Sequence, residues 1–351
     1  MTTGRQLAMV INLDKCIGCQ TCTVSCKTHW TADKEGAENI YYMWCETKPG
    51  LGWPKDWMNM GDQQPRWLED YGGTWQFNWE EVYNSPARST YLHATAKETG
   101  KPVEWGPVWE DDKGGGEWPN GYYFYMPRMC NQCTDAPCIK ACAEHCQDVS
   151  ISPPVMSKRA ADGTLTIDKD SCDSCGMCVG ACPYKIPMRN QASGSYEACN
   201  FCAERTDRGY APVCAKSCPA RAMYFGWLDD KESWVHKLVE EYKVALPLRP
   251  DYGTKPNVYY IPPFIRPKRF GEGNQPLEET DIPVELLREY FGPGVNKALA
   301  TLREHREMAT RGEHSELAEM LIIYRWADAF KPFEVVAPRE VPVAPPATRK
   351  A

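Results

Sequence analysis

Residues 16–26 read CIGCQTCTVSC, and the spacing of the four cysteines in this stretch decides the fold. The first three cysteines follow one another at intervals of three residues, and the fourth comes four residues later. The same spacing recurs once further along the chain, and two more groups of four cysteines have related spacings with longer gaps. The four motifs are Cys16, Cys19, Cys22 and Cys26; Cys130, Cys133, Cys138 and Cys142; Cys172, Cys175, Cys178 and Cys182; and Cys199, Cys202, Cys214 and Cys218.

This spacing is typical of loops that bind [4Fe–4S] clusters. Three closely spaced thiolates on a turning loop reach three corners of one cubane, and the fourth cysteine, about one helical turn beyond, points to the other cluster of a pair. Gly18 and Gly176 relieve crowding within two of the loops. A structural zinc site instead takes four ligands and closes on itself, so the fourth motif alone fits a zinc ribbon. The first and third motifs do not, and we therefore expect iron–sulfur clusters throughout.

The composition excludes several other classes of protein. The chain has 351 residues and 18 cysteines, and a chain of this length needs no disulfide framework to stabilise its core. A formal charge of −7 with interspersed Lys and Arg offers no basic patch for nucleic acid. The mean hydropathy is −0.55, apolar stretches are too short to cross a bilayer, and no signal peptide is visible. Cys45 and Cys146 fall outside the motifs and are expected to be free and buried. Cys146 follows Cys142 by four residues with His145 beside it, so an accessory ligand role is the alternative for Cys146.

The exchange of fourth cysteines between motifs predicts how the ligands pair. The second and third motifs are adjacent in sequence and form one two-cluster unit, so the first and fourth motifs form another. We expect four [4Fe–4S] clusters in a row. Their predicted ligands are Cys16, Cys19, Cys22 and Cys218 for cluster 1; Cys26, Cys199, Cys202 and Cys214 for cluster 2; Cys130, Cys133, Cys138 and Cys182 for cluster 3; and Cys142, Cys172, Cys175 and Cys178 for cluster 4.

The predicted fold class is α+β, with two bacterial-type ferredoxin modules, one inserted in the other. Short apolar or aromatic segments beside the cysteine motifs favour strands at residues 6–12, 121–127, 165–168 and 222–227. Helical patterns follow at residues 231–244, 284–291, 295–309 and 315–327. The predicted divisions are residues 1–45 with 191–230 for the first module, 126–190 for the second, 46–125 for a loop-rich insertion, and 231–351 for a helical and extended region that contacts partner subunits.

The insertion at residues 46–125 is rich in glycine, proline and aromatic residues. It holds eight of the 13 tryptophans: Trp53, Trp57, Trp67, Trp75, Trp79, Trp105, Trp109 and Trp118. One interpretation is a lid that keeps water from the clusters, and the other is a docking surface, because tryptophan is enriched at interfaces. The final stretch, residues 332–351, lacks periodicity and is interpreted as an extended arm lying on a partner.

The sequence contains no recognisable catalytic constellation, so the predicted chemistry is electron transfer without an active site. The histidines are scattered, and no nucleophile elbow, zinc-protease motif or nucleotide-binding loop occurs. A self-contained enzyme with clusters and a free polyferredoxin-type carrier are the alternative hypotheses. The long insertion and the C-terminal arm argue against the free carrier, which needs only a small polar docking face.

Several stretches resemble the iron–sulfur beta subunits of the dimethyl sulfoxide reductase superfamily of molybdenum enzymes. They are residues 5–10 leading into 14–22, the order of the four motifs, residues 243–263, and Trp105-Gly106-Pro107. The chain looks most similar to the branch that contains nitrate reductase, ethylbenzene dehydrogenase, dimethylsulfide dehydrogenase, and the selenate, chlorate and perchlorate reductases. Motif four, with Cys218-Pro-Ala-Arg221, resembles instead the dimethyl sulfoxide reductase and formate dehydrogenase type, which is the alternative branch.

The resemblance implies an electron relay between two partners. A catalytic alpha subunit would carry a molybdopterin cofactor near cluster 1, and a haem b gamma subunit or membrane anchor would lie near cluster 4. The resemblance also implies a periplasmic location by co-export with the alpha subunit; the alternative is a cytoplasmic complex held at the membrane by its partners. In this branch an aromatic residue often stands at the position of Cys175, and cluster 4 is then [3Fe–4S]. The cysteine predicts [4Fe–4S] here.

Overall fold

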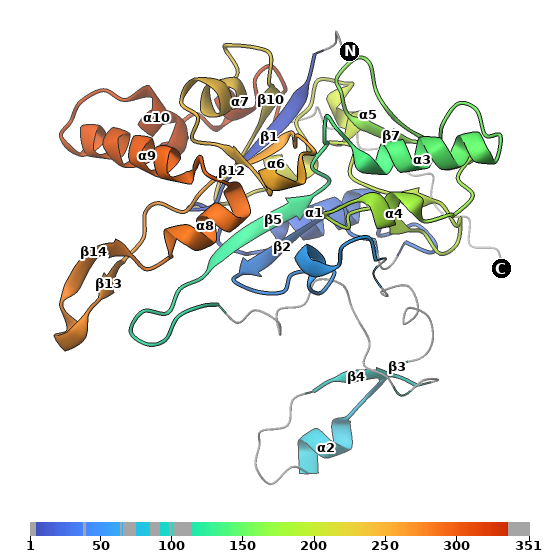
Figure 1. The fold of residues 1–351 in the computed structure, drawn as a ribbon, viewed down its shortest axis with the longest axis horizontal. Helices are drawn as coiled ribbons and strands as arrows, with labels where there is room; N and C mark the ends of the chain where they lie inside the picture. The colour runs from blue at the N-terminus through green and yellow to red at the C-terminus, as the bar shows by residue number, and fades with distance from the viewer. Residues whose placement is uncertain are drawn as a thin grey trace, which may run out of the picture.

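The computed structural model describes residues 5–37, 40–63, 65, 75–84, 92–97, 100 and 114–335 (Figure 1). Within this part, strands and helices alternate in a mixed α+β fold built around one large buried core. Three tryptophans of the insertion, Trp67, Trp105 and Trp109, lie outside the described residues, as do residues 336–351 of the expected C-terminal arm. None of the helices in the described part combines the length and the apolar character needed to span a bilayer.

The central sheet joins the two ends of the cysteine-containing part of the chain. Its order is β10-β1-β12-β11, with β1 (Leu7–Asn12) antiparallel to β10 (Met223–Trp227) and parallel to β12 (Val258–Ile261). The short edge strand β11 (Leu246–Pro247) completes it. All six residues of β1 are buried, and the apolar run of its first five residues suits a strand covered on both faces. The sheet therefore brings the chain before motif one next to the chain after motif four.

A second strand pair brackets the insertion. β2 (Met43–Lys48) runs antiparallel to β5 (Phe124–Met129), with Met43 opposite Met129 and Lys48 opposite Phe124. The described parts of the insertion hold a 3₁₀ turn (Trp57–Asn59) and the elements β3 (Trp75–Phe77), α2 (Trp79–Asn84) and β4 (Ala94–Ala96). β3 and β4 pair with each other and are drawn in cyan in Figure 1.

Short helices begin within the four cysteine motifs, before the last cysteine of each motif. They are α1 (Thr21–Trp30), α3 (Pro137–Asp148), α4 (Met177–Ala181), α5 (Ala203–Thr206) and α6 (Val213–Lys216). Two small strand pairs accompany them, β6 (Met156–Lys158) with β7 (Leu165–Ile167) and β8 (Met188–Arg189) with β9 (Tyr196–Glu197). In Figure 1, α3 and α4 lie one above the other on the opposite side of the molecule from α9.

The C-terminal region packs against the central sheet and is mainly helical. It contains α7 (Trp234–His236), α8 (Val284–Phe291), α9 (Val295–Thr310) and α10 (Glu316–Ile322), together with the hairpin of β13 (Lys268–Phe270) and β14 (Pro276–Thr280). The four predicted strands beside the cysteine motifs are confirmed, as are the helices predicted at residues 284–291 and 295–309.

Two predicted helices are too long. The helix expected at residues 231–244 begins at Trp234, after Ser233 accepts a hydrogen bond from the Val235 N–H, and continues as a π-helical turn over Lys237–Glu241. The helix expected at residues 315–327 ends at Ile322. Ile323 takes a left-handed backbone conformation with φ 56°, and a 3₁₀ turn (Trp326–Phe330) follows. Both errors have the same cause, since apolar periodicity does not report where the backbone leaves α-helical geometry.

A buried ion cluster ties β2 to β5. The carboxylate of Glu46 accepts hydrogen bonds from Arg128 at 2.6 Å and from the Trp44 indole at 2.8 Å, and it pairs with Lys48 at 2.9 Å. The Arg128 guanidinium also lies over the Trp57 ring, 3.7 Å from its centre. Burial opposes ionisation of Glu46, but the two cations and the hydrogen bonds outweigh it and hold its pKa at about 2. Paired in this way, the carboxylate stays charged inside the core.

Candidate iron–sulfur cluster sites

The cysteine loops share one backbone feature that prepares them for metal. In the first Cys-x-x-Cys pair of each motif, the residue before the second cysteine is left-handed, with φ values of 66°, 50°, 66° and 55°. These residues are Gly18, Gln132, Ser174 and Phe201. In three loops the N–H of this residue hydrogen-bonds back to the sulfur of the first cysteine, namely Gly18 to Cys16, Gln132 to Cys130, and Phe201 to Cys199. Such N–H groups stabilise the negative charge of thiolate ligands.

Gly18 is the one of these four positions that has no room for a side chain. A Cβ atom built there would lie 2.5 Å from the ring of Tyr125, in addition to the positive φ. Tyr125 belongs to β5, so the first cysteine loop presses directly against the strand that leads to the second motif. The glycine is therefore required by a close approach as well as by backbone conformation.

The two sites of the second and third motifs are visible as cavities lined by thiols. One cavity is lined by the four cysteines predicted for cluster 3, and Lys158, Leu165 and Tyr184 complete its wall. Another is lined by the four cysteines predicted for cluster 4, together with Val155, Met156 and Tyr196. The structure thus brings each of these two predicted sets around a common space.

The remaining two sets are recognised from the electrostatic influence of one thiol on another. Besides burial, the nearby thiols of Cys16 and Cys218 raise the pKa of Cys22, and those of Cys16 and Cys19 raise the pKa of Cys218. In the other set, burial and the nearby thiols of Cys202, Cys26 and Cys199 raise the pKa of Cys214. These are the groupings predicted for clusters 1 and 2.

The donor sets fit [4Fe–4S] clusters. All 18 cysteines are free thiols, and most of the sixteen motif cysteines are buried or half-buried. Burial, reinforced by neighbouring sulfurs, raises the pKa of Cys22 and of Cys133 to about 12 and that of Cys138 well above its usual value. Four buried thiolates without a counter-charge would repel one another, whereas a positively charged iron–sulfide core would compensate them.

Helices carry the connection from one thiol group to the next. On α3, Cys138 lines the cluster 3 cavity, and Cys142, one turn later, lines the cluster 4 cavity. α4 packs against α3 and connects the same two groups through Cys178 and Cys182. Cys130 links the two middle groups, because its thiol is near enough to that of Cys199 to contribute to the raised pKa of Cys199.

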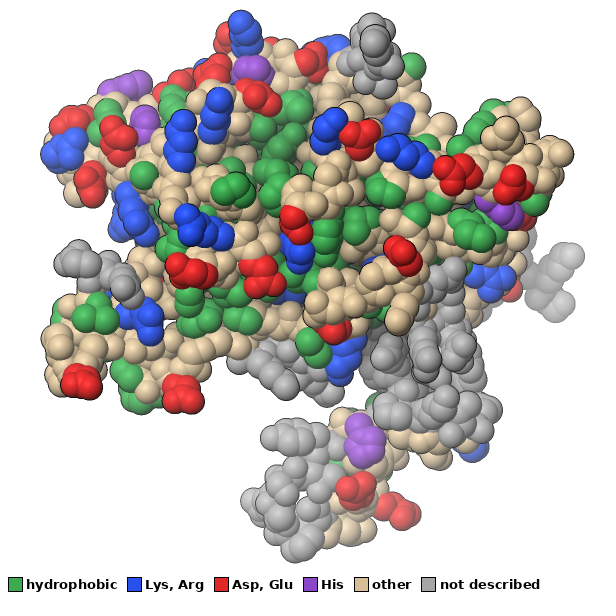
Figure 2. Space-filling view, viewed as in Figure 1, with side chains coloured by type: hydrophobic (Ala, Val, Ile, Leu, Met, Phe, Trp, Pro, Cys, Tyr) green, Lys and Arg blue, Asp and Glu red, His purple; other side chains and the backbone are tan. Residues whose placement is uncertain are grey.

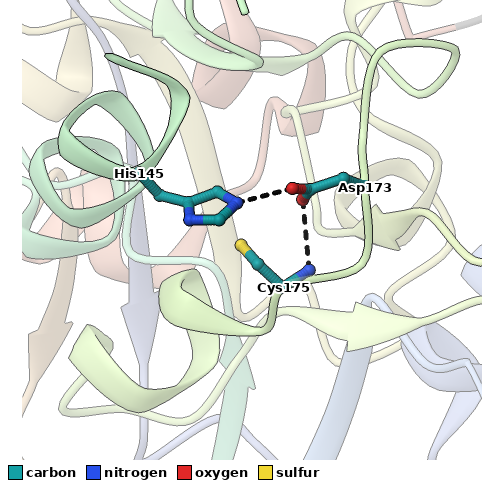
Figure 3. A group of neighbouring side chains, drawn as sticks. All are labelled: His145, Asp173 and Cys175. Carbon is teal, nitrogen blue, oxygen red and sulfur yellow. Dashed lines mark hydrogen bonds and ion pairs between the residues drawn. The ribbon is translucent and has the colours of Figure 1, made fainter. Parts of the chain in front are cut away.

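A polar contact at the surface joins the end of α3 to the third cysteine loop. His145 Nε2 lies 2.5 Å from Asp173 Oδ2, and Asp173 Oδ1 accepts the backbone N–H of Cys175 at 3.2 Å (Figure 3). His145 and Asp173 both line the cluster 4 cavity. No motif predicts this pair, because the two residues are 28 positions apart and meet only in the folded chain.

The two cysteines outside the motifs are free and buried, as predicted, but both lie beside predicted ligands. The sulfur of Cys45 is 3.8 Å from that of Cys16, and the sulfur of Cys146 is 3.9 Å from that of Cys142. The sequence indicated the position of Cys146, which follows Cys142 by four residues, but it gave no sign of the contact between Cys45 and Cys16. For Cys146 a signal existed, because it follows Cys142 at i+4 on a helix; for Cys45 the contact depends on long-range packing of β2.

Comparison with known proteins identifies iron–sulfur domains in this chain. Residues 121–228 match a family described as a 4Fe–4S dicluster domain, and residues 7–28 match a 4Fe–4S binding domain. The chain is 41% identical to the dimethylsulfide dehydrogenase subunit beta of Rhodovulum sulfidophilum, over 93% of this chain and 98% of that protein. This chain belongs to the beta subunits of the dimethyl sulfoxide reductase superfamily.

Other beta subunits extend the likeness. The selenate reductase subunit beta of Thauera selenatis is 39% identical over 93% of this chain and 98% of that protein. The respiratory nitrate reductase subunit beta of Haloferax mediterranei is 43% identical over 90% of each chain. The predicted branch is therefore confirmed. This beta subunit is a non-catalytic iron–sulfur electron-transfer subunit of a molybdenum oxidoreductase complex, whose catalytic partner is an alpha subunit.

Proposed function

We propose that this beta subunit passes electrons along a row of four [4Fe–4S] clusters between a molybdopterin-containing alpha subunit and a haem b gamma subunit or membrane anchor. The observation that carries the proposal is the chain of four thiol groups, in which one helix, α3, supplies cysteines to two neighbouring groups. The cluster ligands are the sixteen cysteines in the four sets given above. Motifs one and four form the outer module, and residues 126–190 form the inserted one.

The ends of the row favour contact with partners. Ile17 and Val24, which lie within the first cysteine motif, expose 60% and 62% of their surface, and Met177, next to Cys178, exposes 49%. Apolar side chains exposed next to terminal redox sites are suited to close docking, which shortens the path of electron transfer. Following the family resemblance, we place the alpha subunit at cluster 1 and the gamma subunit or anchor at cluster 4.

The insertion combines both interpretations of its tryptophans. Trp53 and Trp57 are buried beside Arg128 and belong to the core, whereas Trp79 is half-exposed and Trp118 is 94% exposed. Figure 2 shows one face of the body with hydrophobic patches between charged side chains. We propose that the exposed tryptophans contact a partner subunit, and that the complex is periplasmic through co-export with the alpha subunit.

Metal analysis and magnetic spectroscopy of the purified complex test the proposal. Each beta subunit should contain about 16 iron and 16 sulfide, after subtraction of the alpha subunit's own cluster, and no stoichiometric zinc. Electron paramagnetic resonance during reductive titration should resolve four interacting [4Fe–4S] centres. A strong [3Fe–4S] signal in the intact oxidised complex would overturn the assignment of Cys175, and an iron content near 12 would overturn the count of four cubanes.

A further inference from the structure

Helix α3 carries a third cysteine beyond the two that serve clusters 3 and 4. Cys138, Cys142 and Cys146 stand at intervals of four residues and therefore follow one face of the helix. Cys138 lines the cluster 3 cavity, whereas Cys142 and Cys146 both line the cluster 4 cavity. Five sulfur atoms thus surround the space for a cluster that needs four ligands.

The position of Cys146 is fixed and sheltered. Its exposed fraction is 1%, and its sulfur lies 3.9 Å from that of Cys142. The neighbouring His145 is bound to Asp173, which in turn accepts the N–H of Cys175 (Figure 3). This contact joins the end of α3 to the ligand loop on the other side of the cavity and so holds Cys146 next to the predicted cluster site.

We propose that Cys146 is a reserve ligand of cluster 4, which binds the iron of Cys142 when the Cys142 sulfur is removed or released. The inference rests on the proposed assignment of cluster 4. In the exchange, the Cys146 thiol forms the new iron–sulfur bond and gives up its proton, and the bond from iron to the Cys142 sulfur breaks. When Cys142 is present, its leaving sulfur takes the proton, so no oxidant or reductant is needed.

A purely structural role for Cys146 would not require a thiol. Cys146 belongs to a buried apolar cluster that includes Val155, Leu165 and Val179, and a small apolar side chain such as alanine would satisfy that environment. Cys45 offers an internal comparison, because it is equally close to a predicted ligand, Cys16. It sits within the β2–β5 ladder, and the Gln20 side chain binds both its backbone N–H and its carbonyl. Cys45 is therefore held in place by its strand.

The test compares four variants of the beta subunit within the purified complex, with wild type as reference. Iron content and the electron paramagnetic resonance signals of the clusters are measured in C142A, C146A, C142A/C146A and the matched control C142A/C45A. We expect C146A, C142A and C142A/C45A to keep wild-type iron content, with an altered cluster 4 signal in the last two. Only C142A/C146A should lose cluster 4 or convert it to [3Fe–4S], which amounts to a loss of one to four iron atoms per chain, roughly.

Each alternative result decides against the inference. Loss of cluster 4 in C142A to the same extent as in C142A/C146A would show that Cys146 cannot replace Cys142. Failure of C142A to accumulate as a complex, while C146A accumulates, counts against it equally, because the reserve thiol is expected to sustain assembly. A wild-type complex without a cluster at this site would overturn the proposed function and the inference together, so the wild-type measurement separates the two failures.

Discussion

Trp30 donates its indole N–H to the sulfur of Cys202 over 3.3 Å, and both side chains are buried. A donor aimed at a ligand sulfur stabilises the reduced cluster, which carries one more negative charge, and so raises the reduction potential. We expect W30F to lower the potential of cluster 2 by about 40 mV, the equivalent of roughly 1 kcal/mol for one hydrogen bond. A redox titration followed by electron paramagnetic resonance measures the shift. The half-exposed Trp79 supplies the control W79F; equal potentials in both variants would contradict the prediction.

Removing the carboxylate of Glu46 should destabilise the protein strongly. E46Q leaves Arg128 and Lys48 as buried cations without a counter-charge, and breaking such a group typically costs about 3–5 kcal/mol. Denaturant unfolding of the complex measures the loss. The matched control is E313Q, which breaks the exposed pair of Arg311 and Glu313 and should change stability by about 0.5 kcal/mol or less. Similar effects of the two variants would refute the structural importance of the buried cluster.

The same carboxylate gives a prediction about pH. Because the pKa of Glu46 is lowered to about 2 from 4.5, the stabilisation is fully present above pH 4.5 and is lost only as the pH falls toward 2. The difference in unfolding free energy between wild type and E46Q should therefore be equal at pH 7 and pH 5. A difference that shrinks between these two pH values would show that the carboxylate is not held ionised by its cations.

Substitution of Gly18 should abolish cluster 1. In G18A the new methyl group would collide with the Tyr125 ring at 2.5 Å, and the residue would also keep a φ of 66°. Gly209 provides the matched control, since it has a φ of 79° but open space around its Cβ position. We expect G209A to retain all iron and G18A to lose about four iron atoms per chain. Partial recovery in G18A/Y125A would identify the collision as the cause, and equal iron in G18A and G209A would exclude it.

Trp118 tests the docking role of the insertion. It exposes 94% of its surface, and exposed tryptophans are often the residues on which an interface depends. W118A should weaken the association of the beta subunit with its partners at least tenfold, without changing iron content. Sedimentation or native mass spectrometry of diluted complexes measures this. Unchanged association in W118A would place the interface elsewhere.

The parts of this molecule that sequence predicts are those determined locally. Cysteine spacing indicates iron–sulfur loops because three ligands of one cubane come from one turn, and β1 is evident because its first five residues are all apolar. The predicted ligand sets depend on chain crossing between modules and stay a prediction, although the thiols are grouped accordingly. What the sequence does not reveal arises between distant segments, such as the contact of Cys45 with Cys16 and the pairing of Glu46 with Arg128. The sequence spacing of the two residues indicates neither of these contacts.

If Cys138 and Cys142 bind neighbouring clusters as proposed, their four-residue step on α3 also bears on the speed of the electron relay. The two sulfurs are separated by one helical turn, with a rise of about 5.4 Å to 6 Å fixed by the backbone hydrogen bonds of the helix. Electron tunnelling falls off steeply with distance, so a gap set by covalent and helical geometry stays constant even while surface loops and partner subunits move. In the proposed relay, the local backbone of α3 thus helps to keep the rate of transfer between these two neighbouring centres constant.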